Sequence, residues 1–106
     1  MRRGTTPVHT FRTDTDMHDV AVLWLTYEQE ASGHSFTKTL DDIEIDSEDP
    51  TIFRVRLTQK ETLGFRYKVK PNNVEIQARA KMLDGTARAS KVRSISIERI
   101  LKDGEI

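Results

Sequence analysis

The stretch Val74–Ala89 constrains the fold of this chain more than any other. Its first nine residues alternate between apolar and polar or charged side chains, and the pair Asp84-Gly85 interrupts the pattern. Alternation with a period of two around Asp-Gly is typical of a β-hairpin, and we expect a type I′ turn with these two residues at its centre. The cross-strand pairs of that hairpin are Leu83 with Thr86, Met82 with Ala87, Lys81 with Arg88, and Ala80 with Ala89.

Further strands follow from alternation or from short apolar runs between turn-forming residues. After Ala89 we expect a break near Ser90–Arg93, because one straight strand through this whole stretch would be too long for the domain. The other predicted strands are Val8–Arg12, Val20–Leu25 continuing toward Gln29, Ser35–Leu40, Ile43–Ile45, Phe53–Leu57 and Ile95–Leu101. Thr13–Asp19 is rich in turn formers and predicts a loop or one helical turn.

One short helical segment is predicted near 58–63. Thr58 and Glu61 have the spacing of a capping box, in which each side chain accepts the other residue's backbone N–H. About seven or eight short strands with hardly any helix indicate an all-β fold, an antiparallel immunoglobulin-like β-sandwich. A small β-barrel is the alternative.

Length and composition predict one domain, 1–106. Hydrophobic residues make up 36% and charged residues 32%, which suits a thin core under a charged surface. The 17 basic and 17 acidic residues balance, so net charge favours neither nucleic acid nor an anionic membrane. The absence of cysteine excludes a disulfide framework. The start lacks the apolar run of a signal peptide, and we expect a cytoplasmic protein.

The run Val20–Leu25 is apolar on both alternating phases. Such a strand is either covered on both faces, or its second face meets a partner. We expect Trp24 to be buried in the core together with Ala78, Ala80 and Met82, rather than to serve as an interface anchor or a sugar platform. Exposed aromatic residues for sugar binding would then have to be Tyr27 and Tyr67.

The predicted register places Lys81 opposite Arg88, with Arg79 nearby. Like charges directly opposite each other destabilise a sheet, so either the long side chains separate into water or an acidic partner offsets the repulsion. The candidate partner-binding residues are therefore Arg79, Lys81 and Arg88, with Asp84 and Gly85 at the tip of the hairpin.

The acidic and histidine residues do not form a recognisable site. Asp14, Asp16 and Asp19 lie near His18, but they lack the glycine and the distal glutamate of a calcium loop, and aspartates are common in turns. His9, His18 and His34 fit no zinc spacing, and no serine or cysteine stands in a nucleophile context. We expect no catalytic residue, no metal and no cofactor, and hence no enzyme.

Five segments of the chain carry a resemblance to known proteins. They are Arg2-Arg3-Gly4-Thr5-Thr6-Pro7-Val8-His9-Thr10-Phe11, Leu57-Thr58-Gln59-Lys60-Glu61-Thr62, Val74-Glu75-Ile76-Gln77-Ala78-Arg79-Ala80, Asp84-Gly85-Thr86 and Arg99-Ile100-Leu101-Lys102-Asp103-Gly104. With these segments the chain resembles a family of small proteins of about this length that phages and prophages of Gram-positive gut bacteria encode. The order of its elements is similar, more distantly, to the immunoglobulin-like N-terminal domain of phage baseplate upper proteins. The resemblance implies a virion or prophage context without a described activity.

Together these observations predict a non-enzymatic phage or prophage structural or assembly protein. It would bind itself or other virion proteins through the open edges Val8–Arg12 and Ile95–Leu101 and the hairpin tip, first in the host-cell cytoplasm and then in the virion. The alternatives are a carbohydrate- or host-surface-binding module and a regulatory protein that binds nucleic acid through Arg79, Lys81 and Arg88. We expect no membrane partner and no small-molecule substrate.

Overall fold

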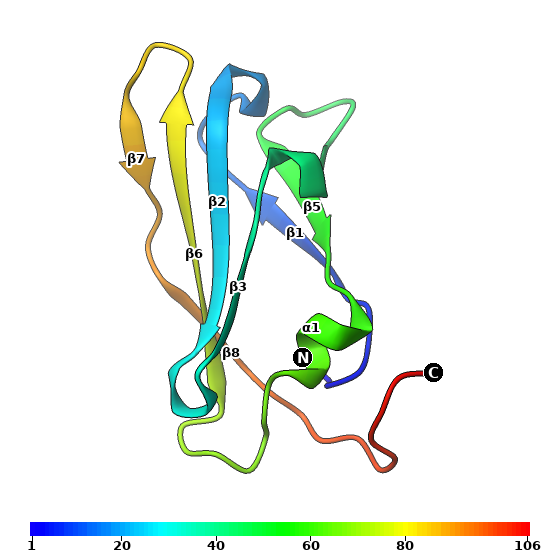
Figure 1. Cartoon of the computed structure of the whole chain (residues 1–106). Coiled ribbons are helices and arrows are strands. Elements are labelled where there is room, and N and C mark those ends of the chain that lie inside the picture. Colours follow the sequence, from blue (N-terminus) through cyan, green and yellow to red (C-terminus); the bar gives the residue numbers. More distant parts are fainter.

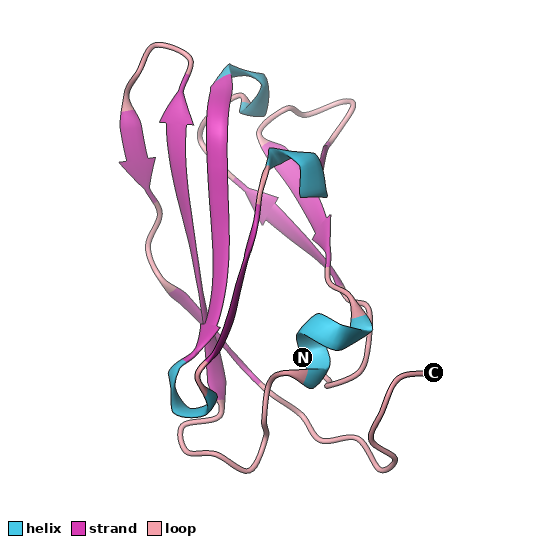
Figure 2. Cartoon of the chain, in the orientation of Figure 1, coloured by secondary structure: helices cyan, strands magenta, loops and turns pink.

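The computed structural model describes all 106 residues, and two antiparallel β-sheets face each other in it (Figures 1 and 2). The strands are β1 (Val8–Arg12), β2 (Val20–Gln29), β3 (His34–Lys38), β4 (Ile43–Ile45), β5 (Ile52–Arg56), β6 (Asn73–Met82), β7 (Ala87–Ala89) and β8 (Arg93–Ser96). The helical segments are the single turns η1 (Met17–Asp19), η2 (Glu30–Ser32) and η3 (Leu40–Asp42) and the short helix α1 (Gln59–Leu63). None of them has the length and apolar character that crossing a bilayer requires.

The smaller sheet has the strand order β1-β5-β4, and the larger sheet has the order β3-β2-β6-β7, with β8 also paired to β6. The core lies between the two sheets, and its buried apolar residues are Met17, Val20, Leu23, Leu25, Tyr27, Phe53, Val55, Leu57, Phe65, Val74, Ile76, Met82 and Ile97. The predicted all-β sandwich is therefore confirmed. The immunoglobulin-like type of sandwich stays a prediction.

Strand β2 has apolar side chains on both of its faces, and it buries those of one face only. A β-bulge between Val20 and Val22 adds one residue, so that Val20 and Leu23 face the core while Val22 and Trp24 face outward. The expectation that Trp24 is buried is wrong, since half of its surface (50%) is exposed. The small sheet covers only one face of β2, and no element of the chain covers the other.

The β6–β7 hairpin forms where the sequence predicts it, but its register differs by one residue. Lys81 pairs with Ala87, and Arg88 pairs with Ala80, so the predicted opposition of Lys81 and Arg88 is wrong. The Met82 N–H donates to the Thr86 carbonyl at 2.8 Å, so the loop has three residues, 83–85, instead of two. Gly85 occupies its left-handed position at φ 88°. A type I turn followed by a left-handed glycine is the usual geometry of such a loop.

The segment after β7 continues along the same edge of β6 with the expected break. Ser90 lies opposite Ala78, and its Oγ accepts the Ala78 N–H at 3.0 Å. Strand pairing with β6 resumes at Arg93, with the register shifted by one residue. The last strand is Arg93–Ser96 and not Ile95–Leu101. Beyond it Ile97 enters the core, and Glu98 forms an isolated bridge with Arg2.

The predicted helical turn is confirmed as α1, and both hydrogen bonds of its capping box are present. The Thr58 N–H donates to Glu61 Oε1 at 2.8 Å, and the Glu61 N–H donates to Thr58 Oγ1 at 3.1 Å. Glu61 Oε1 also lies 2.7 Å from Nζ of the buried Lys38 on β3. The helix is thus held against the edge of the larger sheet, where it closes one end of the sandwich (Figure 1).

Candidate functional site

The larger sheet has one face that no other part of the chain covers, which we call the outer face. Cross-strand pairs share a face, so the strand registers identify its residues. They are Ser35 and Thr37 on β3, Val22, Trp24, Thr26 and Glu28 on β2, Asn73, Glu75, Gln77, Arg79 and Lys81 on β6, Ala87 and Ala89 on β7, and Ser94 and Ser96 on β8. Both large apolar residues in this set are exposed, Val22 at 44% and Trp24 at 50%.

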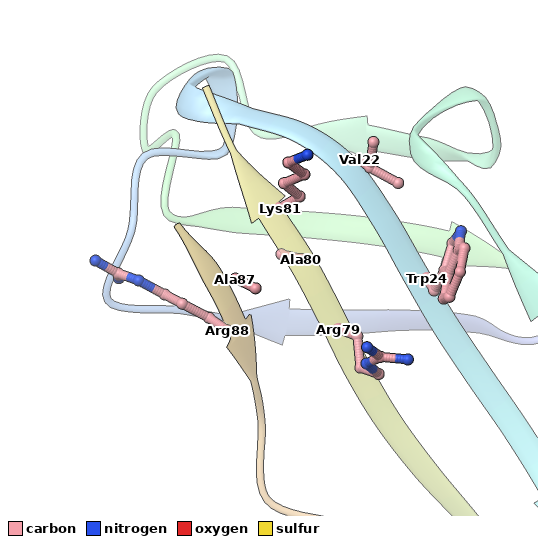
Figure 3. Close-up of a pocket in the computed structure, with 7 residues that line it drawn as sticks. All are labelled: Val22, Trp24, Arg79, Ala80, Lys81, Ala87 and Arg88. Atoms are coloured by element: carbon pink, nitrogen blue, oxygen red, sulfur yellow. The ribbon is translucent and has the colours of Figure 1, made fainter. Parts of the chain in front are cut away.

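At one end of the outer face, Trp24 lies beside two cations (Figure 3). Arg79 is its direct cross-strand neighbour, and the guanidinium carbon lies 5.4 Å from the indole ring centroid, which is cation–π geometry. Lys81 pairs with Val22 two residues further along. These four residues with Ala87 form the Trp24 patch. Together with Ala80 and Arg88 they line a shallow depression of about 310 Å³.

The Trp24 patch contains unpaired positive charge. Neither Arg79 nor Lys81 forms an ion pair within the chain. The opposite end of the outer face is acidic, because Glu28 and Glu75 are direct cross-strand neighbours there and also form no ion pair. Like charges in such a pair repel, so each end of the face would gain from a partner of opposite charge.

The chemistry available to the Trp24 patch is binding. Tryptophan and arginine are the residues most enriched among those that dominate protein interfaces, because they bury a large area and also donate hydrogen bonds. A sheet holds them rigidly, so little conformational entropy is lost when a partner binds.

Arg88 borders the depression beside the patch, but its charged group points away from it. Arg88 pairs with Ala80, whose side chain faces the core side, and its guanidinium donates to Thr15 Oγ1 at 3.0 Å. Figure 3 shows its side chain pointing away from Trp24 and Lys81. The predicted basic cluster of Arg79, Lys81 and Arg88 is therefore reduced to its first two members, because the one-residue change in register moves Arg88 to the opposite face.

Asp84 and Gly85 form the tip of the hairpin. The Asp84 carboxylate accepts the Thr86 N–H at 2.9 Å, and this hydrogen bond, together with the nearby charge of Arg88, lowers the pKa of the carboxyl group. Asp84 thus acts as a turn-stabilising residue, and a shallow polar hollow joins it to Arg88 on the side away from the Trp24 patch.

The free edge of β1 is a second surface open to a partner. Pro7 accepts the Leu57 N–H and Thr13 donates to the Thr51 carbonyl, so the odd-numbered residues of this strand bond to β5. The alternating antiparallel pattern then directs the backbone groups of Val8, Thr10 and Arg12 away from β5. The predicted edge Val8–Arg12 is therefore a true sheet edge.

A groove of about 430 Å³ lies between the sheets, with Phe53, Ala80 and Met82 in its lining.

The acidic loops and the histidines make local contacts. Asp16 accepts the N–H of His18 and caps η1, and Asp46 accepts the N–H groups of Asp49 and Glu48 at 2.9 Å each. These backbone bonds, and then the Arg54 guanidinium, lower the pKa of the Asp46 carboxyl group. His34 bonds to the backbone carbonyl of Glu61 at 2.8 Å. No three His, Asp or Glu side chains in the structure lie close enough together to hold a metal ion.

Sequence reasoning missed Val22 and Trp24 as surface residues. The signal was present in the doubly apolar run Val20–Leu25, for which an exposed second face was one of two interpretations. Tyr27 is fully buried and Tyr67 is half-buried, so neither is the exposed aromatic residue that a sugar platform would require. Comparison of the chain with protein-family models, with curated proteins and with solved structures finds no match.

Proposed function

We propose that this protein is a non-enzymatic structural or assembly protein of a phage or prophage, and that it works through protein–protein contacts. The Trp24 patch is the observation that carries the proposal. It combines an exposed tryptophan, an exposed valine and two unpaired cations on a rigid surface that nothing in the chain covers. The phage context rests on the family resemblance alone.

The composition of the patch favours a protein partner. Burial of an exposed tryptophan against a partner removes a large apolar surface from water, and Arg79 and Lys81 select an acidic neighbour. The β1 edge offers a further contact, since an extended segment of another protein would bond to the free backbone groups of Val8, Thr10 and Arg12.

We also propose that the sandwich is of immunoglobulin-like type. The sheet orders β1-β5-β4 and β3-β2-β6-β7 support this assignment, because they correspond to strands B, E, D and C′, C, F, G of such a sandwich without strand A. Domains of this kind act widely as interaction modules, with function carried by their exposed faces, edges and loops.

The test is incorporation into particles. Phage particles purified on a density gradient from cells that express the tagged chain should contain it, and Trp24→Ala should reduce the amount in the particles strongly. Arg56→Ala, on the exposed surface of the other sheet, is the matched control and should leave incorporation unchanged. Particles free of the wild-type chain would contradict the proposal.

Binding of carbohydrate is the second candidate, and the exposure of Trp24 favours it. Sugars stack on exposed indole rings, and Arg79 and Lys81 at its side would suit an acidic glycan. Trp24 is the only tryptophan, so its fluorescence reports binding directly. A glycan array without hits, and unchanged fluorescence with acidic oligosaccharides, would remove this candidate.

A further inference from the structure

We infer that the outer face is a homodimer interface, in which it packs against the outer face of a second copy about a twofold axis that crosses the strands near Thr26 and Gln77. The inference rests on the proposed function and deepens it, since it names a partner for the Trp24 patch. The order of charges along β2 and β6 supports this interface.

The charge of the outer face changes from positive to negative along the length of its strands. Trp24 pairs with Arg79, Thr26 pairs with Gln77, and Glu28 pairs with Glu75, so the same two strands carry cations at one end, neutral side chains in the middle and carboxylates at the other. The residues at both charged ends lack ion-pair partners within the chain. A surface with this order is complementary to an inverted copy of itself.

One twofold axis satisfies this complementarity. When the axis lies between the two faces and runs across the strands at the level of Gln77, β6 packs over β6 of the second copy in the opposite direction. Arg79 then meets Glu75 of the second copy, and Trp24 lies over the second copy's Glu28 end. An axis parallel to the strands would instead place cations over cations, which charge repulsion disfavours.

The side chains at the two lateral edges of the outer face are small enough for a second copy to approach closely. Ser35 and Thr37 on one side and Ala87 and Ala89 on the other are short side chains. The two ten-residue strands and their neighbours span roughly 33 Å by roughly 14 Å, so a dimer would bury on the order of 900 Å² in total. That area lies at the lower end for specific complexes and predicts a weak, concentration-dependent dimer.

Two reciprocal charge reversals test the interface, because each Arg79–Glu75 contact occurs twice in a twofold dimer. Sedimentation equilibrium of the wild-type chain at low salt should show a monomer–dimer equilibrium that weakens as salt is added. Arg79→Glu alone and Glu75→Arg alone should each raise the dissociation constant by at least about tenfold, because both contacts become repulsive. An equimolar mixture of the two variants should dimerise again, because both contacts become attractive.

The control is Arg56→Glu, the same kind of change on the exposed surface of the smaller sheet, which should leave the dimer intact. A wild-type chain that stays monomeric at high concentration and low salt would overturn the inference, as would mixed variants that fail to associate while each remains folded by circular dichroism. Either result would leave the proposed function standing if the wild-type chain, but not Trp24→Ala, still enters particles. Exclusion of the wild-type chain from particles, with a charge-dependent dimer in solution, would reject the proposed function alone.

Discussion

His9 Nδ1 on β1 and the hydroxyl group of Tyr27 on β2 lie 2.7 Å apart, and their hydrogen bond joins the two sheets through the core. The rings are also stacked, with centroids 5.6 Å apart. Burial, and then the positive N-terminus, lowers the pKa of His9, whereas burial, and then the charge of Glu61, raises the pKa of Tyr27. Both side chains are therefore held neutral near pH 7.

Removal of the Tyr27 hydroxyl group should destabilise the sandwich. In Tyr27→Phe the ring still fills its buried site, but the hydrogen bond to His9 is lost, and we expect a decrease of about 1–2 kcal/mol in the free energy of unfolding. Urea denaturation followed by circular dichroism measures it. Tyr67→Phe is the matched control, and a loss as large as that of Tyr27→Phe would contradict the role of the bond.

Stability should fall as the pH falls from neutral. The pKa of His9 is lower in the folded state than its ordinary value of 6.5, so below that value the unfolded state binds the proton more readily. The contribution of His9 is therefore fully present above about pH 6.5 and is lost as the pH falls through the folded-state pKa. The melting temperature should drop between about pH 7 and about pH 5, and His9→Gln should show a smaller drop. Equal drops in the two proteins would refute this assignment.

The fully buried Gln29 should be essential for the connection between α1 and β6. Its Nε2 donates to the Arg66 carbonyl at 2.7 Å and to the Asn72 carbonyl at 2.9 Å, and its Oε1 accepts the Arg66 N–H at 2.7 Å. Gln29→Leu leaves these three backbone groups unpaired, so we expect a loss of about 3 kcal/mol or more.

Hydrogen exchange of the Arg66 amide gives a local measurement of the same effect, and its protection should decrease in Gln29→Leu. Gln77→Leu is the matched control, because Gln77 makes a single exposed hydrogen bond, to the Ser90 carbonyl at 3.1 Å. Equal losses of stability in the two variants would show that Gln29 does not hold this connection.

Gly85 should contribute to stability only through its backbone conformation. Its φ of +88° is disfavoured for side chains with a Cβ, while an added Cβ would meet no atom within 4 Å. Gly85→Ala should therefore cost about 1 kcal/mol, and Gly85→Asn should cost less, because asparagine tolerates the left-handed region. Thermal denaturation compares the two variants, and an alanine variant as stable as the wild type would exclude the three-residue loop geometry.

The elements of this protein were largely predictable because their signals are local. Alternation in Val74–Met82, turn formers around Asp84-Gly85 and the Thr58–Glu61 spacing each act over a few residues, and the structure contains the corresponding strand, turn and capped helix. The break after Ala89 was predictable from length alone, because a small domain cannot hold so long a strand.

The candidate site was less predictable because it depends on the register and on which face is covered. A two-residue and a three-residue loop both accept Asp84-Gly85, and the difference of one residue decides which face receives Arg88. Likewise, Val20–Leu25 is apolar on both phases, and its sequence cannot specify which phase the opposing sheet covers.

The sequence by itself therefore determined the β-rich architecture, the turn positions and the helix cap, since these depend on interactions between residues close along the chain. Only the tertiary structure decided that Trp24 and Arg79 share an uncovered surface while Arg88 lies on the opposite face. The reason is that burial is a relation between sheets: the second sheet covers one face of β2 and β6 only, and the bulge after Val20 sets which residues point toward it.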